Sequence, residues 1–267
     1  MRSKNAILQR FPLILCRTIF LCLMVILPVR AQADPMIIGI ESNDYYPHYQ
    51  FQDGEFRGYV RDLFDRFAQD SGLKIHLRTM PLKRLLKEVR AGTVHFKYPD
   101  NPKWNVGEKQ SVFLHSDPIV GYIDGTLVLP NQVGGPVENI KTLGTLIGFT
   151  PWPYFDRIQA GAVSVYEGTS LGGVIKRTLR RGKGGLYANI DVARYQLTSL
   201  LGQPDALIFD PNLPHAVSYY AISTVHYPEL LDRFNRWQKE SAAFKAFLEQ
   251  KYGVGDAGIL GQSQLTN

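Results

Sequence analysis

The stretch VSVYEGTSLGGVIKRTLRRGKGGLYANIDVARYQL, residues 163–197, predicts a strand, a turn, a helix, a second strand and a second helix. Apolar residues cluster at 163–167 and 185–188, as in buried strands. Apolar side chains recur at helical spacing over 171–181, and Gly182 stands where a helix ends. A strand–helix–strand unit of this kind predicts an α/β fold.

The same alternation extends along the chain on both sides of this stretch. The Gly-, Pro- and Asn-rich segment at 131–139 separates two α/β series of about ninety residues each, which argues for two lobes. Strands are predicted at 36–40, 74–80, 93–98, 145–149, 163–167, 185–188, 206–209 and 216–223. Helices are predicted at 58–71, 81–92, 153–160, 171–181, 190–201 and 227–252.

Residues 1–33 have the pattern of a secretory signal peptide. A basic start precedes a short apolar run at 19–29, and Ala31-Gln32-Ala33 is a small-x-small cleavage site. The leader holds five of the 30 Lys and Arg residues and none of the 24 Asp and Glu residues, so the mature chain would carry a net charge of +1. The basic balance of the whole chain is therefore no evidence for a nucleic-acid partner. We expect a periplasmic location.

Cysteine and histidine usage excludes several kinds of chemistry. Cys16 and Cys22 both lie in the leader, which leaves the mature chain without disulfides or a thiol nucleophile. The six histidines are scattered without the spacing of metal ligands. Lys183 follows Gly182 but precedes a glycine, so the chain has no P-loop. We expect neither a metal nor a cofactor.

The Gly168-Thr169-Ser170-Leu171-Gly172 turn has the spacing of a hydrolase nucleophile elbow. Asp205 or Asp210 and then His215 follow Ser170 in the chain order of α/β-hydrolases, but no HGGG-type oxyanion segment precedes it. Two other roles stay open for this turn. Thr169 and Ser170 could bind a polar ligand group, or Ser170 could simply cap the helix.

Several segments, taken in order, resemble one family. They are IIGIESNDYYPHYQFQDGEFRGYVRDLFDRFAQDSGLKI (37–75), RLLKEVRAGTVHF (84–96), SDPIVG (116–121), EGTSLGGVIKRTLRRGKGGLYANIDVARYQL (167–197) and YYAISTVHYPELLDRFNRWQKESAAFKAFLEQKYG (219–253). The chain resembles the bacterial extracellular solute-binding proteins of family 3, the periplasmic amino-acid-binding components of ABC importers. Ile119 departs from the aromatic residue that the family has in its Ser-x-Pro-aromatic strand.

The resemblance implies an α/β fold of the two-lobed, type II periplasmic-binding-protein (Venus-flytrap) class with two hinge crossovers. Lobe 1 would comprise 34–126 and 217–267, and lobe 2 would comprise 127–216. The protein would be a monomer and not an enzyme. It would capture a small polar solute, an amino acid or a related amine or acid, in the cleft between the lobes. Its partner would be an inner-membrane ABC permease, or alternatively a membrane sensor.

The resemblance also points to ligand contacts. Asp191 matches a position where the family often places an acid against the ammonium group of the ligand. Where the family has a Thr-x-x-Arg motif that clamps the carboxylate, this chain has Asn101-Pro102-Lys103-Trp104. Lys103, Lys97 or Arg84 would have to replace that arginine, and a lysine lacks its planar fork.

The loops that follow strands, where ligands bind in α/β sheets, supply the remaining candidates. Aromatic rings in these loops could enclose the apolar or cationic part of a ligand. The expected ligand-binding set is Asp44, Tyr45, Tyr46, Arg84, Lys97, Tyr98, Asp100, Trp104, Thr150, Trp152, Thr169, Ser170 and Asp191.

Overall fold

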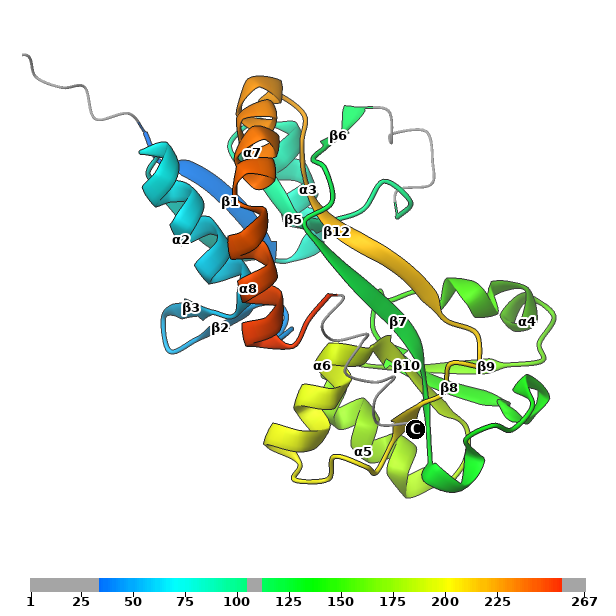
Figure 1. The fold of residues 1–267 in the computed structure, drawn as a ribbon. Coiled ribbons are helices and arrows are strands. Elements are labelled where there is room, and N and C mark those ends of the chain that lie inside the picture. Colours follow the sequence, from blue (N-terminus) through cyan, green and yellow to red (C-terminus); the bar gives the residue numbers. More distant parts are fainter. Residues whose placement is uncertain (1–33, 105–111, 256–267) are drawn as a thin grey trace, which may run out of the picture. The chain divides into compact units, whose positions relative to one another are not determined.

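Strands and helices alternate along the chain, as the hydrophobic pattern predicts (Figure 1). The computed structural model describes residues 34–104 and 112–255, and the predicted leader at 1–33 lies outside the described residues. The strands are β1 (Met36–Glu41), β2 (Gln50–Gln52), β3 (Glu55–Arg57), β4 (Ile75–Met80), β5 (Phe96–Asp100), β6 (Leu114–His115), β7 (Val120–Val128), β8 (Thr142–Leu146), β9 (Ser164–Gly168), β10 (Gly185–Asn189), β11 (Ile208–Phe209) and β12 (Ala216–Thr224). The helices are α2 (Tyr59–Ser71), α3 (Leu82–Arg90), α4 (Phe155–Gln159), α5 (Leu171–Arg181), α6 (Ile190–Tyr195), α7 (Pro228–Glu240) and α8 (Ala242–Tyr252).

Each lobe is built on three parallel strands. In the first lobe, β1 lies between β4 and β5, with Ile38 opposite Leu77 and Phe96. In the second lobe, β8 lies between β9 and β10. Because parallel strands place their carboxyl ends at one edge, the loops that follow them gather along that edge of each sheet.

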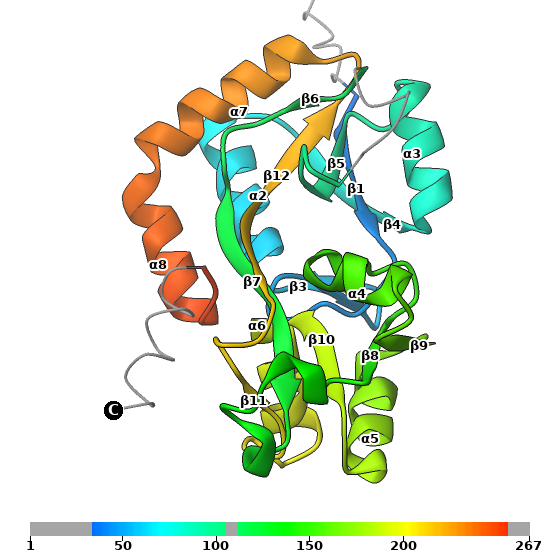
Figure 2. The same cartoon turned by 90° about the vertical axis from the view of Figure 1, so that its right-hand side faces the viewer.

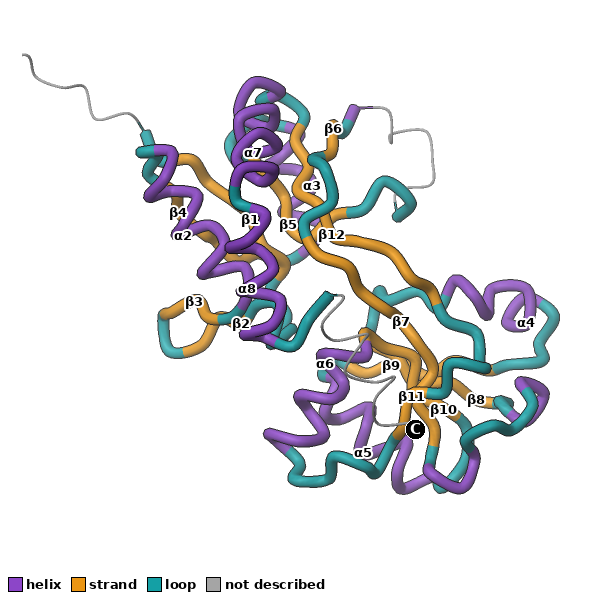
Figure 3. The backbone as a smooth tube through the Cα atoms, viewed as in Figure 1, coloured by secondary structure: helices purple, strands orange, loops and turns teal. Residues whose placement is uncertain are grey.

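The long strands β7 and β12 connect the two lobes (Figure 2). They pair antiparallel with each other, β12 also pairs with β5, and β7 also pairs with β10. Figure 3 shows both as continuous strands that run from one lobe to the other. These strands are the two predicted crossovers, and the two-lobed α/β fold is confirmed. The predicted lobe boundaries at 126/127 and 216/217 fall within β7 and at the start of β12.

Helix α2 closes the first lobe through aromatic packing. Phe64 and Phe67 on α2 contact Phe234 on α7, with ring centroids 5.8 and 5.1 Å apart. Trp237, one turn further along α7, packs against Phe67 and donates from Nε1 to Asp70 at 2.9 Å. Leu231, Phe234, Trp237 and Leu248 of the terminal helical segment therefore face the core, whereas Phe247 is exposed.

The single terminal helix predicted over 227–252 is wrong, because the chain bends at Ser241 between α7 and α8. A straight helix of that length would extend for about 39 Å. The bend lets α8 return along α2, where Lys251 and Tyr252 donate to Asp62 at 2.6 and 2.8 Å. Within the described part of the chain, no helix combines the length and hydrophobicity needed to span a bilayer.

Three other segments differ from the elements predicted from the sequence. The polar-aromatic segment after β1 contains the β2–β3 hairpin, which turns at Asp53 and Gly54 with positive φ at both positions. The strand predicted at 93–98 is β5, displaced toward Asp100, because the chain is still in the turn after α3 as far as His95. The strand predicted at 145–149 is β8, which ends at Leu146 before a turn.

Truncating the buried ring at the α2–α7 contact should cost much of the stability. Phe234 is fully buried, so Phe234→Ala should lower the free energy of unfolding by about 3–5 kcal/mol through lost transfer energy and a cavity. Urea denaturation monitored by circular dichroism measures this change. Phe247→Ala on α8, where the side chain is 57% exposed, should change it by less than about 1 kcal/mol. Equal losses in the two variants would contradict the assignment of Phe234 to the core.

Candidate functional site

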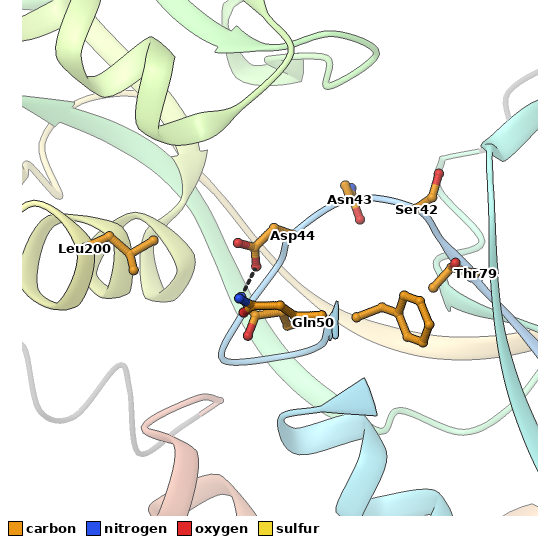
Figure 4. Close-up of a pocket in the computed structure, with 8 residues that line it drawn as sticks. Ser42, Asn43, Asp44, Gln50, Thr79 and Leu200 are labelled. Carbon is orange, nitrogen blue, oxygen red and sulfur yellow. Dashed lines mark hydrogen bonds between the residues drawn. The ribbon is translucent and has the colours of Figure 1, made fainter. Parts of the chain in front are cut away.

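A pocket with a volume of about 470 Å³ opens beside the carboxyl ends of β1 and β4 (Figure 4). The first lobe provides most of its lining, and Leu200, in the π-helical turn after α6, contributes from the second lobe. The carboxylate of Asp44 accepts a hydrogen bond from Nε2 of Gln50 at 3.2 Å. The lining residues are Ser42, Asn43, Asp44, Gln50, Phe51, Gln52, Thr79 and Leu200. Hydroxyl, amide and carboxylate groups therefore line this pocket, and none of these residues is cationic.

An aromatic contact joins the lobes near this pocket. Tyr46, in the loop after β1, lies with its ring centroid 4.4 Å from that of Tyr195 at the end of α6. Tyr252 of α8 meets the same Tyr46 ring edge-on at 6.3 Å. Tyr46 thus lies between the lobes, where an aromatic wall of a ligand site was predicted.

A group of polar and aromatic side chains lies where β7, β10 and β12 meet, and we call it the crossover cluster. Asp124 on β7 is directly opposite Asn189 on β10, so both side chains leave the same face of the sheet. The Tyr220 hydroxyl on β12 contacts the Tyr45 hydroxyl of the first lobe at 3.2 Å and accepts from Nδ2 of Asn189 at 3.2 Å. The cluster consists of Tyr45, Tyr122, Asp124, Asn189, Asp191 and Tyr220.

Asp124 is the acid at the centre of this cluster. Asp124 is only 8% exposed, and its Oδ1 atom is buried without a hydrogen-bond partner. Burial raises the pKa of Asp124 to about 8, a hydrogen bond from Asn189 opposes the rise, and the neighbouring Asp191 carboxylate adds to it. Asp124 therefore holds a proton at neutral pH.

Asp191 lies in the first turn of α6 and is 5% exposed. Asn189 caps this helix, because its Oδ1 accepts from the backbone N–H groups of Asp191 and Val192 at 3.1 and 3.0 Å. Burial raises the pKa of Asp191 to about 7. The Arg194 guanidinium, 3.7 Å away, opposes this rise but does not cancel it. The Oδ1 atom of Asp191 is buried without a hydrogen bond. Both buried carboxyls are thus open to a further donor.

Lys97 and Asp100 form a buried ion pair. Nζ of Lys97 lies 2.9 Å from Oδ1 of Asp100 and donates to the Pro99 carbonyl at 2.8 Å. Burial would raise the pKa of Asp100, but Lys97, and then His115 and Ser223, hold it well below its usual range. These two predicted ligand contacts therefore connect β5, β6 and β12 within the first lobe.

Other predicted contacts also have partners within the protein. Tyr98 is fully buried between the rings of Tyr49, Phe64 and Tyr220. The Arg84 guanidinium bonds to Glu88 one turn along α3, and its side chain is 64% exposed. Of the three candidate replacements for a carboxylate-binding arginine, Arg84 and Lys97 are thus paired with acids, while Lys103 is exposed.

Of the remaining predicted contacts within the described residues, Trp104 borders the crossover cluster, whereas Thr150, Trp152 and Thr169 make no hydrogen bond or ring contact with it. Trp104 packs against Tyr122 and Tyr220, with centroids 6.2 and 5.9 Å apart, and so borders the crossover cluster. Trp152 is 48% exposed, and its ring lies tilted against Phe155 with centroids 5.8 Å apart; Thr150 precedes it by two residues. Thr169 is exposed next to the helix cap.

Ser170 is the N-cap of α5, and its Oγ accepts from the Gly173 N–H at 3.3 Å. A Cβ atom on Gly173 would lie 2.9 Å from that Oγ, so glycine at this position makes room for the cap. His215, the third member of the hydrolase pattern, bonds through Nδ1 to the Leu213 carbonyl at 2.9 Å. Asp210 accepts from backbone N–H groups of Gly134 and Asn212.

The sequence reasoning missed Asp124, Asn189 and Tyr220. The available signal was a lone acid in the otherwise apolar run VGYIDGTLV, because an unpaired charge is costly in a buried strand. His48 was also missed: burial lowers its pKa to about 3, and both ring nitrogens are buried without a partner. Over residues 34–104 and 112–255, no group of three or more His, Cys, Asp or Glu side chains could hold a metal ion.

Removing the helix cap tests the role of Ser170. Ser170→Ala should lower the free energy of unfolding by about 1 kcal/mol, because it deletes the acceptor of the Gly173 N–H. Ser170→Asp should restore most of this loss, since aspartate caps equally well. Chemical denaturation measures both variants. An unchanged stability in Ser170→Ala would argue against capping.

The raised pKa of Asp124 predicts a pH dependence of stability. Between about pH 4 and pH 8 the folded state keeps a proton on Asp124 that the unfolded state releases. The free energy of unfolding therefore falls as the pH rises through this range. Above about pH 8 both states have lost the proton, and Asp124 causes no further change. The slope from Asp124 should reach about 1.4 kcal/mol per pH unit. Asp124→Asn should remove it, and the exposed Asp205→Asn should not. Urea unfolding from pH 5 to pH 9 measures the slopes, and parallel curves for Asp124→Asn and wild type would contradict the burial of an uncompensated carboxyl.

Comparison with known proteins gives matches among solved structures. No sequence family model and no curated protein sequence matches this chain. The arginine-, lysine-, histidine-binding protein ArtJ from Geobacillus stearothermophilus has a TM-score of 0.62 at 18% identity, over 82% of this chain and 95% of that one. A histidine kinase sensor domain with similarity to periplasmic binding proteins has a TM-score of 0.67 at 15% identity, over 85% and 99%.

A third structure connects the fold with catalysis as well as binding. The ancestral amino acid-binding protein AncCDT-1, described as a precursor of cyclohexadienyl dehydratase, has a TM-score of 0.64 at 15% identity, over 82% of this chain and 95% of that one. At these identities the three structures establish the fold. The chain therefore has the two-lobed fold of the periplasmic amino-acid-binding proteins, as its resemblance to solute-binding protein family 3 predicts.

Proposed function

We propose that this protein is a periplasmic solute-binding protein that captures a small polar solute, an amino acid or a related amine, between its two lobes. Ligand binding would stabilise the closed arrangement of the lobes, so that the ligand shifts a hinge equilibrium about β7 and β12. The closed form would then be recognised by the permease of an ABC importer. The predicted leader at 1–33 would place the protein in the periplasm.

The observation that carries this proposal is the convergence of hydrogen-bonding and aromatic groups from both lobes. Tyr46 meets Tyr195 across the junction, and Tyr45 reaches Asn189 through the Tyr220 hydroxyl. The Asp191 carboxyl lies beside this contact, and its buried Oδ1 atom accepts no hydrogen bond. A buried acceptor of this kind is suited to a charge-assisted bond with an ammonium group.

The named binding proteins among the similar structures support the same class of solute. ArtJ is described as binding arginine, lysine and histidine, and AncCDT-1 is described as amino-acid-binding. The hydrolase alternative has less support. Ser170 is used as a helix cap, and His215 and Asp210 are each bonded to backbone groups.

A second candidate function is ligand sensing, and one observation favours it: the similarity to a histidine kinase sensor domain. Both functions use the same ligand-driven closure of the lobes. They differ in the membrane protein that reads the closed form. Co-purification of the liganded protein with membranes that contain a permease or a receptor kinase separates these two partners.

A thermal-shift screen of the mature protein against L-amino acids, amines and small organic acids tests the binding function. A true ligand should stabilise the folded state by about 2.7 kcal/mol at one hundred times its Kd. Asp191→Asn should weaken the binding of an amine ligand by about tenfold or more, because a hydrogen bond to a charged group is lost. Isothermal titration calorimetry measures the Kd.

Asp205→Asn, an exposed acid in the same lobe, is the matched control and should bind like wild type. Unchanged affinity in Asp191→Asn would remove Asp191 from the site. If no solute binds, but an ester is hydrolysed and Ser170→Ala abolishes that hydrolysis, the binding function is wrong and the hydrolase alternative stands.

A further inference from the structure

Asp124 is an acid in the middle of a strand that connects the lobes, and the ion pairs and hydrogen bonds of the fold do not account for it. It faces Asn189 across the β7–β10 pair, and its Oδ1 atom is buried and unpartnered. Burying a carboxyl without its full set of partners costs free energy, and such groups concentrate at functional sites. Its position therefore calls for an explanation in terms of binding.

A second, independent group points into the same place. Asp191 on α6 also has a buried Oδ1 atom without a hydrogen bond, and it lies close enough to Asp124 for the two carboxylates to repel each other. The two side chains come from different elements, β7 and α6, and Asn189 touches both through its hydrogen bonds. Each of the two carboxyls thus has a buried Oδ1 atom that accepts no hydrogen bond.

Among the described residues, Arg194 compensates Asp191 only in part, and Asp124 has no cation paired with it. Arg194 lies 3.7 Å from Asp191, beyond hydrogen-bond distance, and its side chain is 41% exposed. Lys97 is held by Asp100 and by the Pro99 carbonyl. Across 34–104 and 112–255, the ion pairs include none with Asp124.

The walls around the carboxyl pair are aromatic. Tyr122 stacks on Tyr220 with centroids 4.3 Å apart, and Trp104 approaches both rings. Tyr45 brings the first lobe onto this face through its hydroxyl contact with Tyr220. Aromatic faces attract cations, and the carboxyl pair carries negative charge when it releases its protons. The nearby pocket also has a carboxylate, Asp44, and no cation in its lining.

We propose that Asp124 is a second anionic contact for the ligand, beside Asp191, and that it makes the site selective for amines and guanidines over neutral and acidic solutes. This inference rests on the proposed function, because it needs a ligand between the lobes. Opening about β7 and β12 would expose the two carboxyls, and a cation enclosed on closure would supply the missing donors. Asp124 then determines specificity for charge, whereas Asn189 positions Asp191.

The test uses the mature full chain and six named probes in isothermal titration calorimetry. L-lysine, L-arginine, agmatine and 1,4-diaminobutane carry cationic groups, L-glutamine has a neutral side chain, and L-glutamate an acidic one. We expect one or more of the cationic probes to bind best. We expect Asp124→Asn, which keeps the size of the side chain, to weaken that probe by about 10- to 100-fold. The control variant Asp205→Asn should bind like wild type.

A pH profile separates a direct contact from a structural role. The pair must release protons to bind a cation, so wild-type affinity should rise with pH up to about pH 8 and then level off. Asp124→Asn should lose the upper part of this rise, because only Asp191 still titrates. A purely structural role of Asp124 would leave the shape of the profile unchanged. The titratable and charged groups that face the pair are Tyr45, Tyr122, Tyr187, Arg194 and Tyr220.

The outcomes distinguish this inference from the proposed function. If L-glutamine or L-glutamate binds better than every cationic probe, or if Asp124→Asn binds the best cation with wild-type affinity and pH profile, the role of Asp124 is overturned and solute binding stands. If none of the six probes nor any solute of the wider screen binds wild type, the proposed function fails and the inference falls with it.

Discussion

The antiparallel pairing of β7 with β12 is the interaction on which the positions of the other elements depend. β12 pairs with β5 of the first lobe, β7 pairs with β10 of the second, and β7 and β12 pair with each other. The strand contacts hold the parallel cores of the two lobes on one connected sheet. The loop after β1 and the helix after β10 therefore meet between the lobes, where Tyr46 contacts Tyr195. Ligands of α/β folds bind beyond the carboxyl ends of strands.

This arrangement explains why the crossover cluster combines aromatic rings with two buried acids. β7 is buried along most of its length and β12 from Tyr220 onward, and the rings of Tyr45, Tyr122 and Tyr220 pack around this buried part. Within that setting a carboxyl loses hydration and retains its proton, as the raised pKa values of Asp124 and Asp191 indicate. By contrast, Asp100 is buried with Lys97, His115 and Ser223 around it, and its pKa is lowered. The same residue type is thus ionised where cationic and hydrogen-bonding partners surround it, and keeps its proton where burial dominates.

Local signals made most of the elements predictable. The helix at 171–181 and the stop at Gly182 depend on spacing and on a left-handed C-cap, which are properties of neighbouring residues, and both match α5. The bend at Ser241 and the β2–β3 hairpin were not predicted, because packing of α8 on α2 and pairing of two three-residue strands outweigh the local pattern. The candidate site was predicted in part: Tyr45, Tyr46, Trp104 and Asp191 lie at the junction, whereas Tyr98 is in the core and Arg84 pairs with Glu88.

The sequence by itself determined the α/β class, the two successive series of strands and helices, and the turns at which polar residues follow strands. These properties depend on hydrophobic periodicity and on caps, which act over a few residues. Only the tertiary structure decided which of the acids meet. Asp124 and Asp191 come together because the register of β7 on β10 places Asp124 opposite Asn189. Strand register between segments distant in the chain is set by the packing of whole faces, and no short stretch of sequence specifies it.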